Sequence, residues 1–432
     1  MTRSIAVAAL QLRAGDRGDF PGGLESTLDA LRRAAKEADL VVLPEATFPA
    51  YVLGNEPLDD GAIEGAIERV REIARESATV IVAGVAVRDG GVRNAAVVVD
   101  ADGSIAGRAD KLFLWHFDRR WFERGERLAP IATRAGVLGV LICADGRLPT
   151  ISRALVDRGA EALVMPTAWV TSGRNPQALE NVQADLLARV RAYENRVPFI
   201  AANKCGSELG MVAYCGKSQV IDADGEILGL ASERETQALY ARVTLGAEPA
   251  PRARPAQPAR RHNSAAQTLR LAMAYEPLPP DIDERLALLD DAYAIAPEDH
   301  ARLRALDEAV PLASVNDETV LDPGGLVPFR RAGYVLFCWS TGLRQPWLER
   351  VARARAIELR VYLVVFDHVA RRAFAVDPDG VVVAGTFDDY RLASFAFDPR
   401  KTVETTVAPG SDVRDALEDV AEIIAREEIL ER

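Results

Sequence analysis

Short apolar runs alternate with amphipathic segments along the first 245 residues of this chain, and this alternation limits the folds available to it. Apolar runs of a few residues are typical of buried strands, and longer amphipathic segments are typical of helices. Strands that alternate with helices indicate a layered α/β domain. The expected elements, in chain order, are a strand over 5–10, a helix over 23–38, a strand over 40–43, a helix over 62–76 and a strand over 79–87.

Two later segments carry the pattern of a β-hairpin. The segments from Val97 to Gly103 and from Val220 to Gly225 are each an apolar run that closes on Asp-Gly. Asp-Gly is a favoured turn between antiparallel strands. We therefore expect mixed sheets.

The length and a change in composition divide the chain. With 432 residues it is longer than one ordinary domain. Residues 246–267 read "GAEPAPRARPAQPARRHNSAAQ", which is rich in Pro, Ala and Arg and has no apolar period. Such a segment is typical of an extended, exposed linker. The predicted domains are residues 1–245 and 268–432.

The second predicted domain repeats part of the first. "RVRAYENRVPFI" at 189–200 is similar to "RARAIELRVYLV" at 353–364, and "RGAEALVM" at 158–165 is similar to "RAGYVLFC" at 331–338. A hairpin with Asp-Gly follows in both places. A repeat of this length indicates a duplicated domain rather than a short solenoid unit. We interpret residues 268–432 as a shortened, degenerate second copy.

Charge and composition exclude several classes of partner. The formal net charge is −12, which gives no electrostatic reason to bind nucleic acid or an anionic membrane. No run of eighteen apolar residues occurs, and the N-terminus lacks the pattern of a secretory signal. We expect a cytoplasmic protein with a small-molecule partner.

The metal-binding and disulfide-forming residue types are few and scattered. The four cysteines form neither a disulfide framework nor a C-x-x-C pattern, and the four histidines form no H-x-x-x-H pair. The sequence therefore predicts no metal site.

One cysteine stands where a nucleophile would be presented. Cys143 ends an apolar run, and a turn follows it before the next helical segment. A strand-to-helix corner places backbone N–H groups near the sulfur, as an oxyanion requires. The alternative is a small buried side chain, which is the common fate of a free cysteine.

Two charged residues occupy similar places. Glu45 follows the apolar run that begins at Val41, and Lys111 directly precedes Leu-Phe-Leu-Trp. Lys111 alone could equally be an ordinary surface lysine. Together with Cys143, however, they supply a general base, a cation that lowers the pKa of a thiol and stabilises an oxyanion, and a nucleophile.

At these residues the chain resembles the nitrilase superfamily of carbon–nitrogen hydrolases. "VVLPEATFPAY" at 41–51, "ADKLFLW" at 109–115 and "GVLICADGRLPTISRAL" at 139–155 are similar to its glutamate, lysine and cysteine motifs, in the same order. The resemblance covers roughly residues 3–245. Three separate motifs in order are far more specific than one.

The resemblance implies a four-layer αββα sandwich and a Glu45–Lys111–Cys143 triad. The thiolate of Cys143 would attack an amide-type carbon, Glu45 would transfer protons, and Lys111 with the backbone N–H of Ala144 would hold the oxyanion. Water would then hydrolyse the thioester. The resemblance implies no metal and no organic cofactor.

Some positions depart from the pattern of the superfamily. A second active-site glutamate often stands seven residues before a glycine that corresponds to Gly125, and counting back reaches Asp118, which is one methylene shorter. Ala144 stands where many members have an aromatic residue. Trp169 and Tyr51 are candidates for lining the substrate pocket, although Trp169 is equally well explained as a packing residue.

Three functions remain open. The motif context favours an amidase or carbamoylase over a nitrilase. The alternatives are an acyltransferase that uses the same thioester and a non-catalytic binding or regulatory protein on this fold.

The second copy is expected to be inactive. The segment between Thr268 and Arg331 is too short for strands that would carry three catalytic residues, and Cys338 aligns with Met165 rather than with Cys143. In this superfamily subunits pair through outer helices, so the second copy would cover such a face as an intramolecular pseudo-dimer partner. Further homo-oligomerisation stays open.

Overall fold

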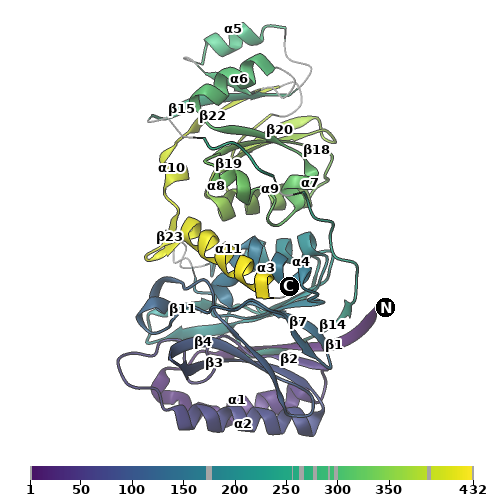
Figure 1. Cartoon of the computed structure of the whole chain (residues 1–432), viewed down its shortest axis with the longest axis vertical. Helices are drawn as coiled ribbons and strands as arrows, with labels where there is room; N and C mark the ends of the chain where they lie inside the picture. Colours follow the sequence, from purple (N-terminus) through teal and green to yellow (C-terminus); the bar gives the residue numbers. More distant parts are fainter. Residues whose placement is uncertain are drawn as a thin grey trace. The chain divides into compact units, whose positions relative to one another are not determined.

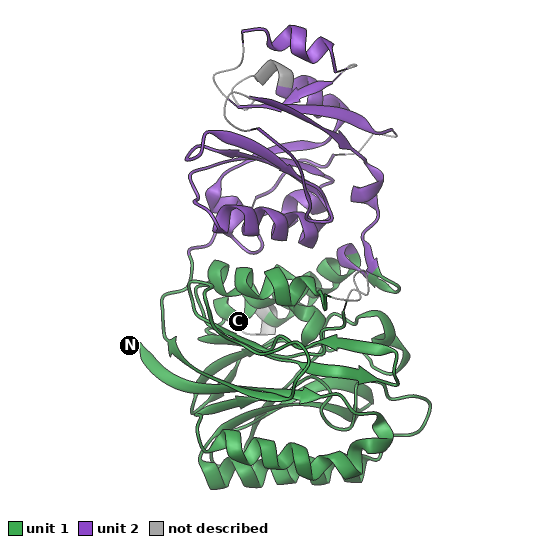
Figure 2. Ribbon diagram, turned by 180° about the vertical axis from the view of Figure 1, so that it is seen from behind, with its two compact units in different colours: residues 1–250, 408–411, 415–432 green, residues 251–407, 412–414 purple. Residues whose placement is uncertain are grey.

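The computed structural model describes residues 2–171, 178–254, 256–261, 267–275, 280–289, 292–295, 300–386 and 391–430. The chain divides into two compact units, which Figure 2 shows in green and purple. Unit 1 comprises residues 1–250, 408–411 and 415–432, and unit 2 comprises residues 251–407 and 412–414. The sequence interpretation placed all of 268–432 in the second domain. The structure differs, because the end of the chain returns to unit 1.

Unit 1 contains two mixed sheets, in agreement with the hairpin signals. The first sheet has the strand order β11-β10-β1-β2-β3-β4-β5, with β14 paired to β1, and the second has the order β13-β12-β9-β8-β7-β6. The strands of the first sheet are β1 (Arg3–Arg13), β2 (Leu40–Val42), β3 (Val80–Asp89), β4 (Gly91–Val99), β5 (Ile105–Asp110), β10 (Lys204–Glu208), β11 (Val212–Cys215) and β14 (Gln237–Leu245). Those of the second are β6 (Ile131–Thr133), β7 (Gly136–Val140), β8 (Ala162–Pro166), β9 (Phe199–Ala202), β12 (Gln219–Ile221) and β13 (Ile227–Leu230).

Helices cover the outer faces of the two sheets. Figure 1 shows α1 (Phe20–Ala35) and α2 (Asp60–Ser77) on one side, and α3 (Pro149–Asp157) and α4 (Ala188–Asn195) on the other. The predicted four-layer αββα sandwich is therefore confirmed for unit 1. The helix α1 begins earlier than the pattern indicated, because Pro21 fits the first turn of a helix, where its missing N–H is not needed.

The core of unit 1 follows from helical periodicity. The residues Leu28, Leu31 and Ala35 of α1 recur at helical spacing, and all are buried against the first sheet. The strand β2 is buried at every position, because it lies between β1 and β3 and parallel to both. This buried strand leads directly to Glu45.

Unit 2 contains a three-stranded sheet of order β16-β15-β22 and a five-stranded sheet of order β17-β18-β19-β20-β21. Its strands are β15 (Leu269–Ala274), β16 (Tyr293–Ile295), β17 (Leu312–Val315), β18 (Leu336–Thr341), β19 (Tyr362–Asp367), β20 (Arg372–Val376), β21 (Val382–Gly385) and β22 (Leu392–Phe397). Its helices are α5 (Ile282–Ala287), α6 (His300–Ala309), α7 (Asp317–Leu321), α8 (Val327–Arg331), α9 (Trp347–Leu359) and α10 (Arg400–Val403).

The strand directions in unit 2 match those in part of unit 1. The strand β15 has a parallel neighbour, β16, and an antiparallel neighbour, β22, as β1 has β2 and β14. The five strands β17 to β21 pair with the same directions as β7, β8, β9, β12 and β13. Where unit 1 has β3 to β6, the described part of unit 2 has only α6.

Specific contacts also occur at matching places in the two units. Nε of Arg189 donates to the carbonyl of Gly225 at 2.8 Å, and Nε of Arg353 donates to that of Gly380, also at 2.8 Å. Each of the two helices, α4 and α9, also contains a buried Arg–Glu ion pair at i,i+3 spacing. The interpretation of unit 2 as a shortened copy stays a prediction.

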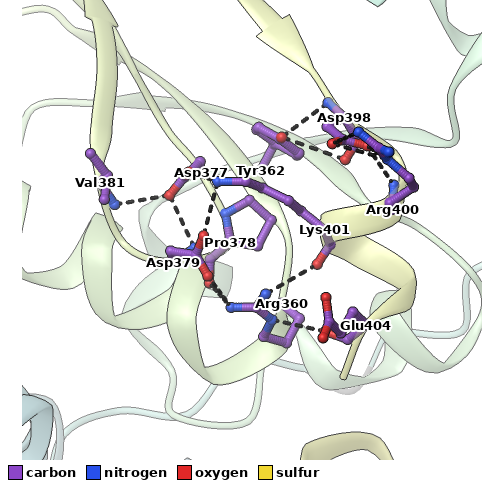
Figure 3. A network of polar contacts seen from close by, with 10 residues as sticks. All are labelled: Arg360, Tyr362, Asp377, Pro378, Asp379, Val381, Asp398, Arg400, Lys401 and Glu404. Atoms are coloured by element: carbon purple, nitrogen blue, oxygen red, sulfur yellow. Dashed lines mark hydrogen bonds and ion pairs between the residues drawn. The ribbon is translucent and has the colours of Figure 1, made fainter. Parts of the chain in front are cut away.

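A charged network holds the segment through which the chain leaves unit 2 (Figure 3). Nζ of Lys401 lies 2.5 Å from Oδ2 of Asp377 and 2.9 Å from Oδ2 of Asp379. Arg360 donates to Asp379 and to the carbonyl of Glu404. The helix α10 is thereby fixed to the Asp-Gly hairpin within unit 2.

The described linker residues, 246–254 and 256–261, form neither helix nor strand. The linker is not exposed throughout, because Ala253 is buried and its backbone N–H donates to Oδ2 of Asp322 at 3.2 Å. In the described part of the chain, every helix is too short or too polar to cross a lipid bilayer.

Candidate active site

Glu45 is fixed directly after β2 by backbone contacts. Its backbone N–H donates to the carbonyl of Thr167 at 3.3 Å. Gly84 of β3 lies against this segment so closely that a Cβ there would be 2.2 Å from the carbonyl oxygen of Pro44 and 2.7 Å from Cα of Glu45. A glycine is therefore required at position 84 for the Glu45 backbone to approach the sheet.

Lys111 connects two carboxylates in the interior of unit 1. Nζ of Lys111 lies 2.7 Å from Oε1 of Glu45 and 2.7 Å from Oδ2 of Asp118, and all three side chains are completely buried. An ammonium group has three donors, so two are used by these carboxylates and a third is left for a ligand. The residue that counting back from Gly125 had identified thus lies in the site.

The charge of this lysine is stabilised by its neighbours. Burial alone lowers the pKa of a lysine, but the carboxylates of Asp118 and Glu45 outweigh burial and raise the pKa of Lys111 well above its usual value. The two carboxylates thus favour the charged form of Lys111 in the interior.

Cys143 begins a tight turn directly after β7. The turn, Cys143–Arg147, is a short 3-10 helix, and Cys143 has the left-handed backbone angle φ of +47°. A side chain in this conformation is strained and must be held by its surroundings. Asp145 supplies part of that support, because its carboxylate accepts from the backbone N–H groups of Ile142 at 3.0 Å and Phe113 at 2.7 Å. One carboxylate thus fixes the cysteine turn to the segment that follows Lys111.

The thiol of Cys143 is protonated at neutral pH. Burial and the Glu45 carboxylate raise its pKa to about 12, although the Lys111 ammonium and the Thr167 side chain act in the opposite direction. The sequence-based expectation that Lys111 lowers this pKa is correct in direction, but burial outweighs the effect. A base must therefore accept the thiol proton during attack.

Two carboxylate oxygens are available for that chemistry. Oε2 of Glu45 and Oδ1 of Asp118 are buried and have no hydrogen-bond partner among the described residues. An unpaired buried acceptor is costly unless it serves a ligand or a reaction. These two atoms are candidates for contact with a proton or a substrate N–H group.

The two predicted lining residues, Tyr51 and Trp169, are both buried. Tyr51 packs in an apolar cluster with Ala46 and Tyr214, and Nζ of Lys111 lies 5.8 Å from the centre of its ring. Trp169 is 1% exposed, and its indole Nε1 has no partner among the described residues. Their contact with a substrate stays a prediction.

Asn94 of β4 belongs to the site but was not identified from the sequence. The side-chain Nδ2 of Asn94 donates to Oε1 of Glu45 at 2.7 Å. The backbone carbonyl of Asn94 accepts from the backbone N–H of Lys111 at 2.8 Å. The available signal was a polar residue that begins the apolar run "NAAVVV" in a strand.

A second buried ion pair, also missed, supports the segment after Glu45. Nζ of Lys204 lies 2.6 Å from Oε1 of Glu208 and donates to the carbonyl of Ala46 at 3.1 Å. Oε2 of Glu208 accepts from the backbone N–H of Val52 at 2.8 Å. The pair therefore holds both ends of the loop that carries Tyr51.

Comparison with known proteins places this site in a family. The family model described as carbon-nitrogen hydrolase matches residues 6–249. The (R)-stereoselective amidase of a Pseudomonas species is 30% identical over 52% of this chain and 80% of its own length. The apolipoprotein N-acyltransferase of Geobacter metallireducens is 30% identical over 49% of this chain and 41% of its own length.

A solved structure with the same fold shows a modified cysteine. It is a mutant of the amidase from Nesterenkonia sp. AN1, with the acetamide moiety of fluoroacetamide covalently added at its active-site cysteine. The identity is 26% and the TM-score is 0.50, over 55% of this chain and 89% of that one.

Proposed function

This chain belongs to the carbon–nitrogen hydrolase family, and we propose that it hydrolyses the C–N bond of a linear amide or an N-carbamoyl compound through a thioester on Cys143. The observation that carries the proposal is the buried Lys111, which bridges Glu45 and Asp118 within the electrostatic range of the Cys143 thiol. A nucleophile, a base and a fixed cation are the groups that acyl transfer needs.

The first half of the proposed reaction forms the thioester. The sulfur of Cys143 bonds to the amide carbon while Oε2 of Glu45 takes the thiol proton, and the carbonyl electron pair moves to oxygen. The third N–H of Lys111 and the backbone N–H of Ala144 stabilise that oxyanion. The C–N bond then breaks, and Glu45 returns its proton to nitrogen, so that ammonia or an amine leaves.

The second half releases the acid. Water attacks the thioester carbon while Glu45 takes a proton from it, and the C–S bond breaks. The sulfur recovers a proton, and the carboxylic or carbamic acid leaves. The raised pKa of Cys143 supports a concerted role for Glu45, because the resting thiol cannot ionise unaided at neutral pH.

Asp118 is proposed to position the substrate nitrogen. Its Oδ2 is occupied by Lys111 at 2.7 Å and by the backbone N–H of Trp115 at 2.7 Å, while Oδ1 is unpaired. An amide NH2 group can donate to such an oxygen, whereas a nitrile carries no N–H. This difference favours an amide-type substrate over a nitrile.

Acyl transfer is a second candidate function. The observation that favours it is the similarity to an apolipoprotein N-acyltransferase. The same thioester on Cys143 would then be attacked by an amine in place of water.

Unit 2 is proposed to be a non-catalytic copy. The register of β7 on β8 pairs Val140 with Val164, and that of β17 on β18 pairs Ala313 with Phe337. Three residues beyond Ala313, where unit 1 has Cys143, stands Asn316, which accepts from the backbone N–H of Thr319. An asparagine that caps a helix cannot form a thioester. The pseudo-dimer role of this copy and the cytoplasmic location of the protein stay predictions.

The test is an ammonia-release screen over linear amides, ureido acids and nitriles, with Cys143→Ala as the blank. The proposal expects release from an amide or ureido acid by the wild type and none above the blank by the variant. Addition of an amine acceptor distinguishes transfer from hydrolysis, because transfer yields a new amide in place of the acid. Equal release by the wild type and Cys143→Ala would refute the proposal.

A further inference from the structure

The end of the chain forms part of the catalytic unit. After unit 2, residues 408–411 and 415–432 rejoin unit 1 (Figure 2). They include Ser411 and most of the helix α11 (Val413–Leu430), which Figure 1 shows beside α3. Arg158, at the end of α3, donates to the carbonyl of Ile424 in α11 at 3.3 Å. We call residues 408–411 and 415–430 the C-terminal strap.

The strap contacts the loop between Lys111 and Gly125 through a buried serine. The side chain of Ser411 is completely buried. Its Oγ accepts from the backbone N–H of His116 at 2.7 Å and donates to the carbonyl oxygen of Leu114 at 3.5 Å. One hydroxyl can make both contacts. His116 has a φ of +47°, a conformation that is unfavourable for its side chain and therefore needs support from its neighbours.

The turn that Ser411 holds leads directly to the catalytic ion pairs. Trp115 lies between the two residues that Ser411 contacts, and its backbone N–H donates to Oδ2 of Asp118 at 2.7 Å. The same oxygen lies 2.7 Å from Nζ of Lys111. A shift of the turn would therefore move Asp118, and with it the ammonium group that faces Glu45.

Three further polar contacts join the strap to the same loop and to Glu126, which follows it. Nε of Arg119 donates to the carbonyl of Gly410 at 2.9 Å, Arg124 forms an ion pair with Asp419, and Arg426 donates to the carbonyl of Glu126 at 2.7 Å. Directly beside Arg124, the backbone N–H of Gly125 donates to the carbonyl of Lys111 at 2.8 Å. The strap thus contacts this segment at several positions between Leu114 and Glu126.

A cavity of about 130 Å³ lies between the loop and α11. Its lining includes Leu112, Leu114, Ala416 and Asp419. Discrete polar contacts, such as that of Ser411, therefore contribute to holding the loop beside this space.

We propose that the C-terminal strap is a positioning element of the hydrolase site, and that Ser411 is its principal positioning residue. Ser411 acts through the Leu114–His116 turn on Asp118 and Lys111. The inference rests on the proposed function, but it concerns residues outside the family match, which ends at residue 249. An active site that needs residue 411 is complete only after residues 251–407 of unit 2 have been synthesised.

The first test is Ser411→Ala in the full chain, with Thr79→Val as the matched control. Thr79 is also buried, and its hydroxyl also contacts the backbone, at the carbonyls of Ala35, Ala38 and Ser77. We expect Ser411→Ala to lower kcat at least tenfold with a small change in KM, and to slow the alkylation of Cys143 by iodoacetamide between pH 7 and 9. Thr79→Val should lower Tm without changing kcat or the alkylation rate.

The second test uses an exposed contact of the strap, so that folding is not at risk. Arg124 and Asp419 are each more than a third exposed, and a pair of this kind contributes little to stability. We expect Arg124→Asp and Asp419→Arg each to lower kcat and slow alkylation, and the double exchange to recover both. If Ser411→Ala does not fold, the charge exchange between Arg124 and Asp419 tests the proposal by itself.

The proposal would be overturned if a folded Ser411→Ala variant had the kcat and the Cys143 alkylation rate of the wild type. It would also be overturned if the double exchange had a kcat and an alkylation rate no higher than those of the single variants. Alkylation of Cys143 needs no turnover, so it reports on the strap even if no amide is hydrolysed. Absence of hydrolysis by the wild type would refute the proposed function. If the wild type hydrolyses an amide and Ser411→Ala has the same kcat and alkylation rate, only the positioning role of the strap would be refuted.

Discussion

Nζ of Lys111 and Oε1 of Glu45 lie 2.7 Å apart, and neither side chain has any exposed surface. A buried ion pair is expensive to desolvate and is weak support for stability by itself. Here the pair gains a second carboxylate from Asp118 and an amide donor from Asn94. The arrangement holds a charged base and a cation beside a nucleophile, which is the requirement of a covalent hydrolase.

Removal of the cation should slow the chemistry of the thiol. Since the Lys111 ammonium lowers the pKa of Cys143, Lys111→Met should raise that pKa further and slow alkylation of Cys143 at neutral pH. Two buried carboxylates would also lose their partner, so we expect a loss of about 3–5 kcal/mol in the free energy of unfolding. Alkylation kinetics and urea titrations measure the two effects. Unchanged alkylation would place Lys111 outside the site.

Gly84→Ala should disrupt the position of Glu45. A Cβ at residue 84 would overlap backbone atoms of Pro44 and Glu45, which cannot rotate away. We expect a loss of about 1–3 kcal/mol of stability together with a large fall in kcat. Gly65→Ala is the control, because an added Cβ meets nothing within 4 Å in the exposed part of α2, and should stabilise by about 0.5–1 kcal/mol. A Gly84→Ala variant with wild-type kcat would contradict the role of this contact.

The buried thiols predict a loss of stability in alkali. Burial raises the pKa of Cys338 in β18 to about 12, whereas an unfolded cysteine has a pKa of about 8.5. Above about pH 8.5 the folded state therefore keeps the Cys338 proton, whereas the unfolded state releases it. The contribution of this thiol to the free energy of unfolding is fully present below about pH 8.5 and is lost as pH rises. Between pH 8 and pH 10 the free energy of unfolding of the wild type should fall by roughly 2 kcal/mol more than that of Cys338→Ala.

Urea titrations of both proteins at the two pH values provide the measurement. The comparison with Cys338→Ala isolates this thiol from the other titrating groups. Turnover by Cys338→Ser, on the other hand, should match the wild type; its loss without unfolding would contradict a non-catalytic unit 2.

The sequence predicted the layered fold and the central residues of the site because both depend on local patterns. Alternating apolar runs predicted β1, β2 and β3, and three short motifs predicted Glu45, Lys111 and Cys143. Asp118 required only counting from Gly125. Each of these inferences uses residues that are close together in the chain.

The remaining features depend on contacts between distant segments. The side chains of Asn94 and Asp145 contact distant segments through hydrogen bonds that leave no periodic signal in the sequence. The helix α11 has an ordinary amphipathic pattern, so its sequence shows that one face is buried but not which unit covers it. The net pKa of Cys143 depends on burial, which competes with the charge of Lys111 and cannot be weighed from the sequence.

Replacement of the nucleophile should separate catalysis from folding. Cys143→Ala removes one small side chain that is 7% exposed, so the fold should persist while kcat falls at least about 10³-fold. Circular dichroism and kcat, compared with those of Cys215→Ala, measure the two effects. Residual activity above about a tenth of wild type would contradict the assignment, since loss of a nucleophile costs far more.

The central claim is a covalent intermediate on Cys143, and acid-quenched mass spectrometry during turnover tests it most directly. With the amide that the wild type hydrolyses fastest, the account predicts that the peptide containing Cys143 gains the mass of the acyl group. Peptides containing Cys205, Cys215 or Cys338 should stay unmodified. Two results would contradict this claim. One is rapid turnover without an adduct on Cys143, both in the wild type and in a slowed Glu45→Gln variant. The other is an adduct on another cysteine.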